Sequence, residues 1–166
     1  MTMEEALKIL EMQEEILQFS HFTNSDAWEL GCMMVLESKR RGLPIAITIQ
    51  LNNGYTVFQY GNDGTNLDNQ YWLTRKCNTV KRTDMSSLRH YMLLEESGDT
   101  LEDRCMKPEE YANSGGAFPV RIEEVGVIGA IAVSGMDHVA DHDFLVKCVS
   151  KYLHVDEIPR ISVNMI

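Results

Sequence analysis

A hairpin signal in the first third of the chain constrains the fold more than any other feature of the sequence. Within residues 45–51 the large apolar side chains recur at every second position, which is the periodicity of a β-strand. Asn53 and Gly54 follow closely, and this dipeptide is the strongest short-range hairpin signal because both residues tolerate positive φ angles. We therefore predict that residues 55–60 return as a second, antiparallel strand.

A second strand pair is predicted in the last third of the chain. In residues 117–123 the apolar side chains of Val120 and Ile122 alternate with charged side chains. Residues 125–133 are nearly all β-branched or small and apolar, as expected of a central strand that is covered on both faces.

The other patterned segments predict helices, because their apolar residues recur three or four positions apart. These segments are residues 3–18, 24–41, 67–96 and 139–153. Asn24 or Ser25 is expected to cap the second segment, and Gly42 to end it. The long third segment is expected to break near Thr83 and Asp84, whose side-chain oxygens can cap a new helix. Two antiparallel strand pairs with helices around them predict one α+β domain that spans residues 1–166.

The charge balance excludes two classes of partner. The chain carries 25 acidic and 15 basic residues, a net charge of −10. Nucleic-acid binding draws most of its affinity from a basic surface, so we expect no nucleic-acid partner. Adsorption to an anionic membrane needs basic residues for the same reason, so we expect no membrane partner.

The cysteines and the apolar runs indicate a cytoplasmic protein. The four cysteines are widely spaced and form no C-x-x-C pair, which favours free thiols over a structural zinc site. No apolar run approaches the ~20 residues of a membrane span. The chain opens Met-Thr-Met-Glu-Glu, without the apolar region of a secretion signal.

Three segments together resemble one protein family. They are residues 72–80 (WLTRKCNTV), residues 114–121 (SGGAFPVR) and residues 126–135 (GVIGAIAVSG), with Asp141 and His142 shortly after the last. The combined pattern resembles the haem-degrading-like group that includes GlcG and HbpS, and the resemblance runs from about residue 20 to residue 155.

This resemblance implies a profilin-like fold, in which helices flank an antiparallel sheet, and assembly into homo-oligomers. It also makes haem a possible cofactor or ligand. The candidate ligand-binding residues are Arg75, Lys76, Asn78, Gly115, Gly116, Phe118, Arg121 and His142.

Arginines and glycines suggest two ways of holding an anion. Arg75, Arg82 and Arg89 recur every seven residues, so an unbroken helix would align them into a stripe for a carboxylate or phosphate. The alternative is a solvated face paired with acidic residues or a neighbouring subunit. Gly115 and Gly116 can present backbone N–H groups to an anion, or they can simply allow a sharp turn with positive φ.

His138 and His142 suggest a metal or haem-iron ligand, because a spacing of four places both imidazoles on one face of a helix. The alternative is structural. Asp137 and Asp141 favour a helix N-terminus through the helix dipole, and His142 then packs in a polar contact.

Three functions follow from these residues and from the resemblance. The first is binding or degradation of haem or a related small anionic ligand. The second is a non-catalytic oligomeric scaffold or protein-interaction module. The third, a metal-dependent enzyme, rests only on His138 and His142. No nucleophile-elbow motif is present, so whether the chain is an enzyme stays open.

Overall fold

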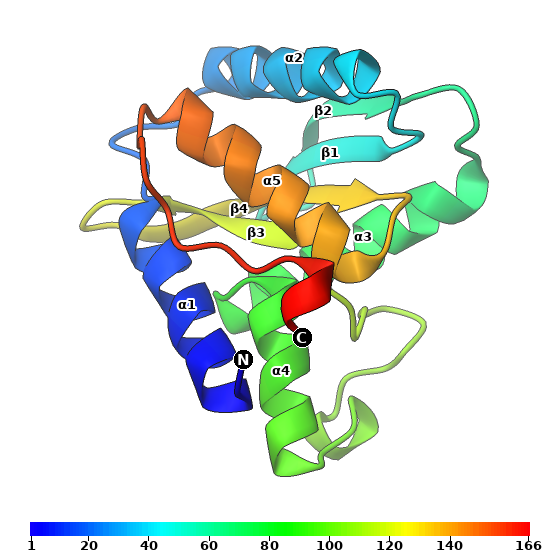
Figure 1. Cartoon of the computed structure of the whole chain (residues 1–166). Helices are drawn as coiled ribbons and strands as arrows, with labels where there is room; N and C mark the ends of the chain where they lie inside the picture. The colour runs from blue at the N-terminus through cyan, green and yellow to red at the C-terminus, as the bar shows by residue number, and fades with distance from the viewer.

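A computed structural model describes all residues, 1–166, as five α-helices packed around one four-stranded sheet (Figure 1). The helices are α1 (Met3–Ile16), α2 (Asn24–Arg40), α3 (Leu67–Thr83), α4 (Ser87–Ser97) and α5 (His138–Tyr152). The strands are β1 (Ala46–Leu51), β2 (Thr56–Gly61), β3 (Ala117–Ile122) and β4 (Gly126–Ser134). Two 3-10 turns, Glu102–Arg104 and Val163–Met165, complete the chain. The predicted α+β class, with helices flanking an antiparallel sheet, is confirmed.

The sheet joins the two predicted hairpins. Its strand order is β2-β1-β4-β3, and every neighbouring pair is antiparallel. The long-range pairing is between β1 and β4, where Ile49 lies opposite Ile131. β4 is therefore a central strand, as its nearly continuous apolar sequence predicts.

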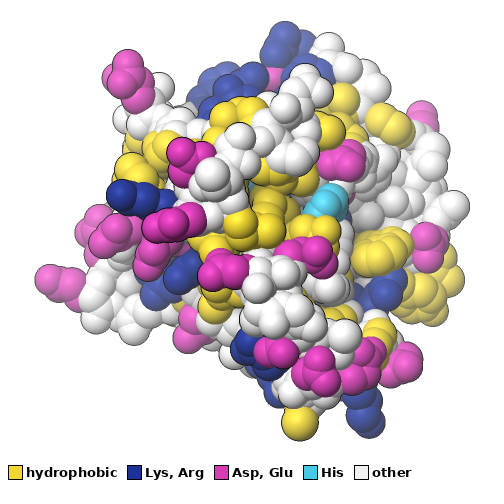
Figure 2. Space-filling model, turned by 60° about the horizontal axis from the view of Figure 1, so that its bottom comes forward, with side chains coloured by type: hydrophobic (Ala, Val, Ile, Leu, Met, Phe, Trp, Pro, Cys, Tyr) yellow, Lys and Arg dark blue, Asp and Glu magenta, His cyan; other side chains and the backbone are white.

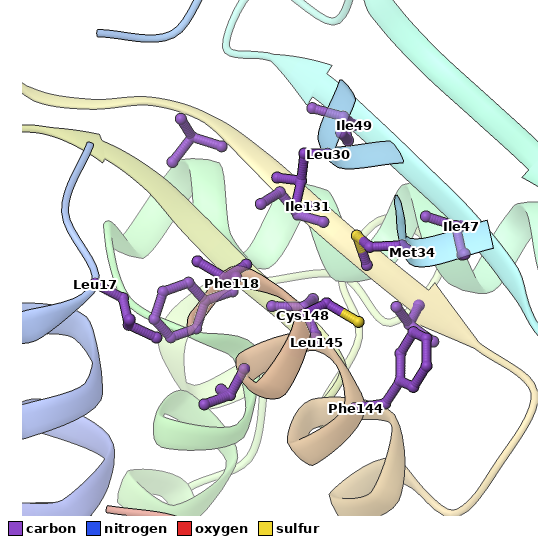
Figure 3. Packing of buried hydrophobic residues seen from close by; sticks show 14 of the residues in the cluster. Leu17, Leu30, Met34, Ile47, Ile49, Phe118, Ile131, Phe144, Leu145 and Cys148 are labelled. Carbon is purple, nitrogen blue, oxygen red and sulfur yellow. The ribbon is translucent and has the colours of Figure 1, made fainter. Parts of the chain in front are cut away.

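Strand alternation gives the sheet two different faces. Large side chains such as Ile47, Ile131 and Phe118 point toward α2 and α5 and form the main hydrophobic core (Figure 3). Alanines at alternate positions, among them Ala130 and Ala132, point toward α3. Because these side chains are small, α3 can lie close to the sheet on that face.

Helix termini follow local capping chemistry. Thr23 caps α2, one residue before the predicted Asn24 or Ser25, and its hydroxyl accepts the N–H of Asp26. The predicted break in the segment 67–96 is present, but Ser86 supplies the cap of α4. Asp84 is instead the left-handed residue that ends α3, with φ of 58°. Its side chain is therefore not the predicted cap.

The exposed surface carries charges of both signs. On the face that comes forward when the molecule of Figure 1 is tilted, acidic side chains surround a band of hydrophobic ones (Figure 2). No helix combines the length and the apolarity that crossing a bilayer requires. The four cysteines are free thiols: Cys77 and Cys148 are buried, Cys32 is half-buried and Cys105 is exposed.

Candidate functional site

A recess lies beyond the C-terminal end of β4, where the three segments that resemble the family meet. One side comes from α3, the second from the loop before β3, and the third from the turn that joins β4 to α5. Its volume is about 320 Å³. The lining residues are Asp68, Asn69, Trp72, Lys76, Ser114, Ser134, Gly135, Met136, His138 and Asp141.

A buried ion pair lies in the wall of this recess. The Lys76 Nζ donates to Asp141 Oδ2 at 3.1 Å and to the Val133 carbonyl at 2.8 Å. The two charged side chains are only 3% and 2% exposed. Burial lowers the pKa of Lys76 and raises that of Asp141, while the attraction between them opposes both shifts. The pair ties α3 to β4 and α5.

Gly116 gives this ion pair its space. Its φ of +118° is one that residues with a side chain rarely adopt. A Cβ at this position would lie 2.6 Å from the Lys76 Nζ and 2.8 Å from the Val133 carbonyl oxygen. For Gly116 this geometry supports the turn interpretation with positive φ; Gly115 does not have a positive φ.

His138 lines the recess, and its imidazole accepts a backbone hydrogen bond. The Gly115 N–H donates to its Nδ1 at 2.9 Å, so the proton of the neutral imidazole resides on Nε2. Burial lowers the pKa of His138, which favours this neutral form. An imidazole whose Nδ1 accepts and whose Nε2 is protonated has no lone pair left for a metal ion.

His142 lies in the protein core rather than in a site that a ligand could reach. Its side chain is fully buried, and Nε2 is 2.8 Å from the Gln13 Oε1. The Gln13 amide is oriented by its own donation to the Pro159 carbonyl, so Nε2 of His142 is the donor. Burial lowers the pKa of His142 to about 4. No group of three or more metal-ligating side chains gathers around either histidine.

The arginine stripe does not form, because α3 ends before Arg89. The guanidinium of Arg75 stacks over Trp72 at 4.1 Å. Arg82 donates to the carbonyls of the loop 104–105, and Arg89 on α4 pairs with Glu14 at 2.9 Å. The alternative interpretation, a face paired with acidic residues, describes Arg89, whereas Arg82 is bound to backbone carbonyls instead.

Three other predicted residues make contacts within the protein that stabilise the fold. Asn78 donates to the Glu110 carbonyl at 2.8 Å, and Arg121 donates to the Asp84 carbonyl at 2.7 Å. Phe118 is fully buried in the core. The recess thus gathers Lys76 and His138, next to Gly115 and Gly116, and a ligand role for the predicted residues stays a prediction.

A groove between α2 and α5 was missed by the sequence analysis. Its volume is about 480 Å³, and its apolar lining consists of Met33, Leu36, Phe144 and Cys148. Around this lining lie four basic residues and one acid: Arg40, Arg41, Lys147, Lys151 and Glu37. The spacing of Lys147 and Lys151 on α5 was the available signal, since residues four apart share a helix face.

The groove is electropositive on a protein of net charge −10. Glu37 pairs with Arg40 at 2.6 Å, which leaves Arg41, Lys147 and Lys151 without an ion pair. The Arg41 guanidinium lies over the Phe144 ring, 5.8 Å from its centroid. Burial raises the pKa of the Cys148 thiol to about 12, so this cysteine is protonated at neutral pH. The groove therefore combines apolar contact area with unpaired positive charge.

Comparison with known proteins agrees with the resemblance found in the sequence. Residues 22–150 match the model of the family described as haem degrading protein HbpS-like. A UPF0303 protein of Edwardsiella ictaluri is 40% identical over 158 residues, which cover 95% of this chain and 100% of that protein.

Solved structures agree in fold. The crystal structure of the Ybr137w protein superposes with a TM-score of 0.82 at 29% identity, covering 91% of this chain and 90% of that one. A PduOC:heme complex superposes with a TM-score of 0.66 at 15% identity, covering 78% and 93%, which is a likeness of fold alone. With its family match over residues 22–150 and its close UPF0303 relative, this chain belongs to the HbpS-like family of haem-degrading proteins.

Proposed function

We propose that this protein binds an anionic, largely apolar small molecule of the haem class in the groove between α2 and α5. The observation that carries the proposal is the set of unpaired cations, Arg41, Lys147 and Lys151, beside an apolar lining. Hydrogen bonds between cationic side chains and carboxylates are among the strongest in proteins. An acidic protein that keeps three unpaired cations around one apolar groove is suited to an anion with an apolar body.

Haem fits this description. The groove volume of about 480 Å³ lies within the usual range for small-molecule pockets, about 300–1,000 Å³. The macrocycle would lie against Met33 and Phe144, and the propionates would pair with the basic residues. The family description and the haem complex of the PduOC relative support the same ligand class. When bound, haem would supply a redox-active iron.

The iron is not the main anchor in this proposal. No histidine lines the groove, and the Cys148 thiol is buried with a raised pKa, so the groove does not present a ready-made thiolate to an iron. Met33 offers a thioether, which is a weaker ligand. Affinity is therefore expected to come from the macrocycle and the carboxylates, and a porphyrin without iron is expected to bind.

The proposal is tested by titrating haemin into three forms of the protein and following absorbance. They are the wild type, the double variant Arg41→Glu/Lys147→Glu, and the control Lys8→Glu/Lys107→Glu, which changes net charge equally but lies outside the groove. Loss of two charge-assisted hydrogen bonds, each worth about 1.5–3 kcal/mol, predicts at least a 100-fold loss of affinity in the groove variant. Equal affinities in the two variants would refute the groove as the site.

A non-catalytic oligomeric module is the second candidate function. Four large apolar side chains on the helices that cover the sheet are more than half exposed: Trp28, Leu36, Leu67 and Tyr71. Exposed apolar side chains of this size favour protein interfaces. Sedimentation velocity tests self-association directly. An assembly that takes up no porphyrin would favour this function over ligand binding, whereas a monomer would argue against it.

The cytoplasmic location of the protein stays a prediction.

A further inference from the structure

The recess beyond the end of β4 contains a buried ammonium group that the protein satisfies only in part. The Lys76 ammonium has three N–H donors, and the fold uses two of them, on the Asp141 carboxylate and on the Val133 carbonyl. The Lys76 side chain is only 3% exposed, yet it lines the recess. An unsatisfied donor on a buried charged group is costly. The acceptor for the third N–H must therefore come from within the recess.

Three more donors of the recess lack an acceptor in the protein. His138 accepts the Gly115 N–H at Nδ1, so the proton on its Nε2 is free to donate. The Ser134 hydroxyl accepts from the Asn69 amide at 3.3 Å and donates to no group. The indole N–H of Trp72, which also lines the recess, makes no hydrogen bond within the protein. The recess therefore concentrates N–H and O–H groups that are available to a ligand.

The two acids of the recess do not supply the missing acceptors. Asp141 is buried, and both of its carboxylate oxygens are in use: Oδ2 accepts from Lys76, and Oδ1 accepts the Met136 N–H at 3.0 Å. The pair of Lys76 and Asp141 carries no net charge. Asp68 is exposed, and its carboxylate forms no hydrogen bond or ion pair, so solvent screens its charge. The free donors therefore determine what the recess attracts.

Two helices begin at this recess, which adds to its preference for negative charge. α5 begins at His138, and α3 begins at Leu67, one residue before Asp68. α3 and the first turn of α5 lie side by side beyond the end of β4 (Figure 1). A helix N-terminus carries a partial positive charge, whose effect is largest within the first turn. A negative group in the recess is therefore stabilised by both helices as well as by the free donors.

We propose that the recess binds a small carboxylate, whose oxygens accept from the third N–H of Lys76, the Nε2–H of His138 and the Ser134 hydroxyl. A carboxylate has two oxygens with about four acceptor sites, so it can accept from all three groups at once. The volume of about 320 Å³ is at the lower end of the usual range for small-molecule pockets. The recess shares no residue with the groove between α2 and α5, so this site is independent of the ligand proposed there.

Trp72 provides a reporter inside the recess. The chain has two tryptophans, and Trp28 lies outside the recess, so the Trp28→Phe protein carries Trp72 as its single tryptophan. Lactate is titrated into this protein at constant ionic strength while the fluorescence of Trp72 is followed, and lactamide serves as the neutral probe of equal size. A saturable change is expected with lactate and none with lactamide at the same concentrations. An equal response to both probes, or no saturable response to lactate, would overturn the proposal.

A histidine variant assigns the binding to the recess while it leaves the buried ion pair intact. In His138→Asn the asparagine Oδ1 can still accept the Gly115 N–H, but the Nε2–H donor is lost. Loss of one hydrogen bond to a charged ligand is expected to weaken lactate binding by about 10-fold or more. His154→Asn is the matched control, because His154 is exposed, lies outside the recess and has a φ of 57°, which asparagine tolerates. It is expected to leave the affinity unchanged.

An aspartate variant distinguishes an anion site from a cation site. Asp68→Asn removes the unpaired negative charge from the lining, so lactate is expected to bind more tightly. Circular dichroism confirms that each variant is folded. Weaker lactate binding in Asp68→Asn, or the same affinity in His138→Asn as in His154→Asn, would overturn the proposal and would leave the groove between α2 and α5 untouched.

Discussion

Acid should destabilise this protein through His142. The imidazole is fully buried, and its pKa falls from 6.5 to about 4 in the folded protein. The structural reason is that Nε2 already donates to Gln13 while Nδ1 has no partner. A second proton would therefore place an unpaired N–H and a positive charge in the core.

The sign and the size of the effect follow from this shift. Because the folded-state pKa is the lower one, the unfolded chain binds the proton first as the pH falls below 6.5. The free energy of unfolding therefore falls between pH 6.5 and about pH 4. It falls by about 1.4 kcal/mol per pH unit, or about 3 kcal/mol in total.

Urea unfolding across this pH range tests the prediction with His142→Gln as the matched variant. Glutamine does not titrate, and its amide can still donate to Gln13. The variant is expected to be less stable near neutral pH and to lose about 3 kcal/mol less than the wild type on acidification. Parallel stability curves for the two proteins would refute the reasoning.

Three further predictions follow from the packing. Lys76→Met should lower the free energy of unfolding by about 3–5 kcal/mol because it leaves the Asp141 carboxylate buried without its partner; a urea midpoint close to that of the wild type would contradict this. Gly31→Ala should cost about 1–3 kcal/mol because the added methyl group would meet the Phe58 ring, and thermal unfolding should show a lower Tm. Iodoacetamide should modify Cys105 before the buried cysteines, and mass spectrometry of the native protein showing the reverse order would contradict the fold.

Much of the fold could be predicted from local signals. The period-two pattern before Asn53 and Gly54 fixes one hairpin, and the continuous apolar run at 125–133 identifies the central strand. Helix ends depend on more than local sequence. Thr83 and Asp84 carry oxygens suited to capping, but Ser86 makes the cap, because the choice among neighbouring polar residues depends on where the turn positions each one.

The candidate sites could be predicted only in part, because they are built by contacts between residues that are far apart in the sequence. Lys76 and His138 were predicted and line the recess, but Asp141, the partner of Lys76, is 65 residues away in the sequence. The groove was missed because Arg41 and Lys147 lie on different helices, and only the packing of α2 on α5 brings them together. His142 is in the core because its polar partner, Gln13, comes from α1.

The central claim is that the groove recognises an apolar body that carries carboxylates. The most direct measurement compares the affinities of protoporphyrin IX and its dimethyl ester for the wild-type protein by fluorescence titration. Both lack iron and share the macrocycle, but the ester has lost the two negative charges. The account predicts saturable binding of the acid with one porphyrin per chain, and binding of the ester that is at least 100-fold weaker. Equal affinities for the two porphyrins, or no saturable binding of the acid, would contradict it.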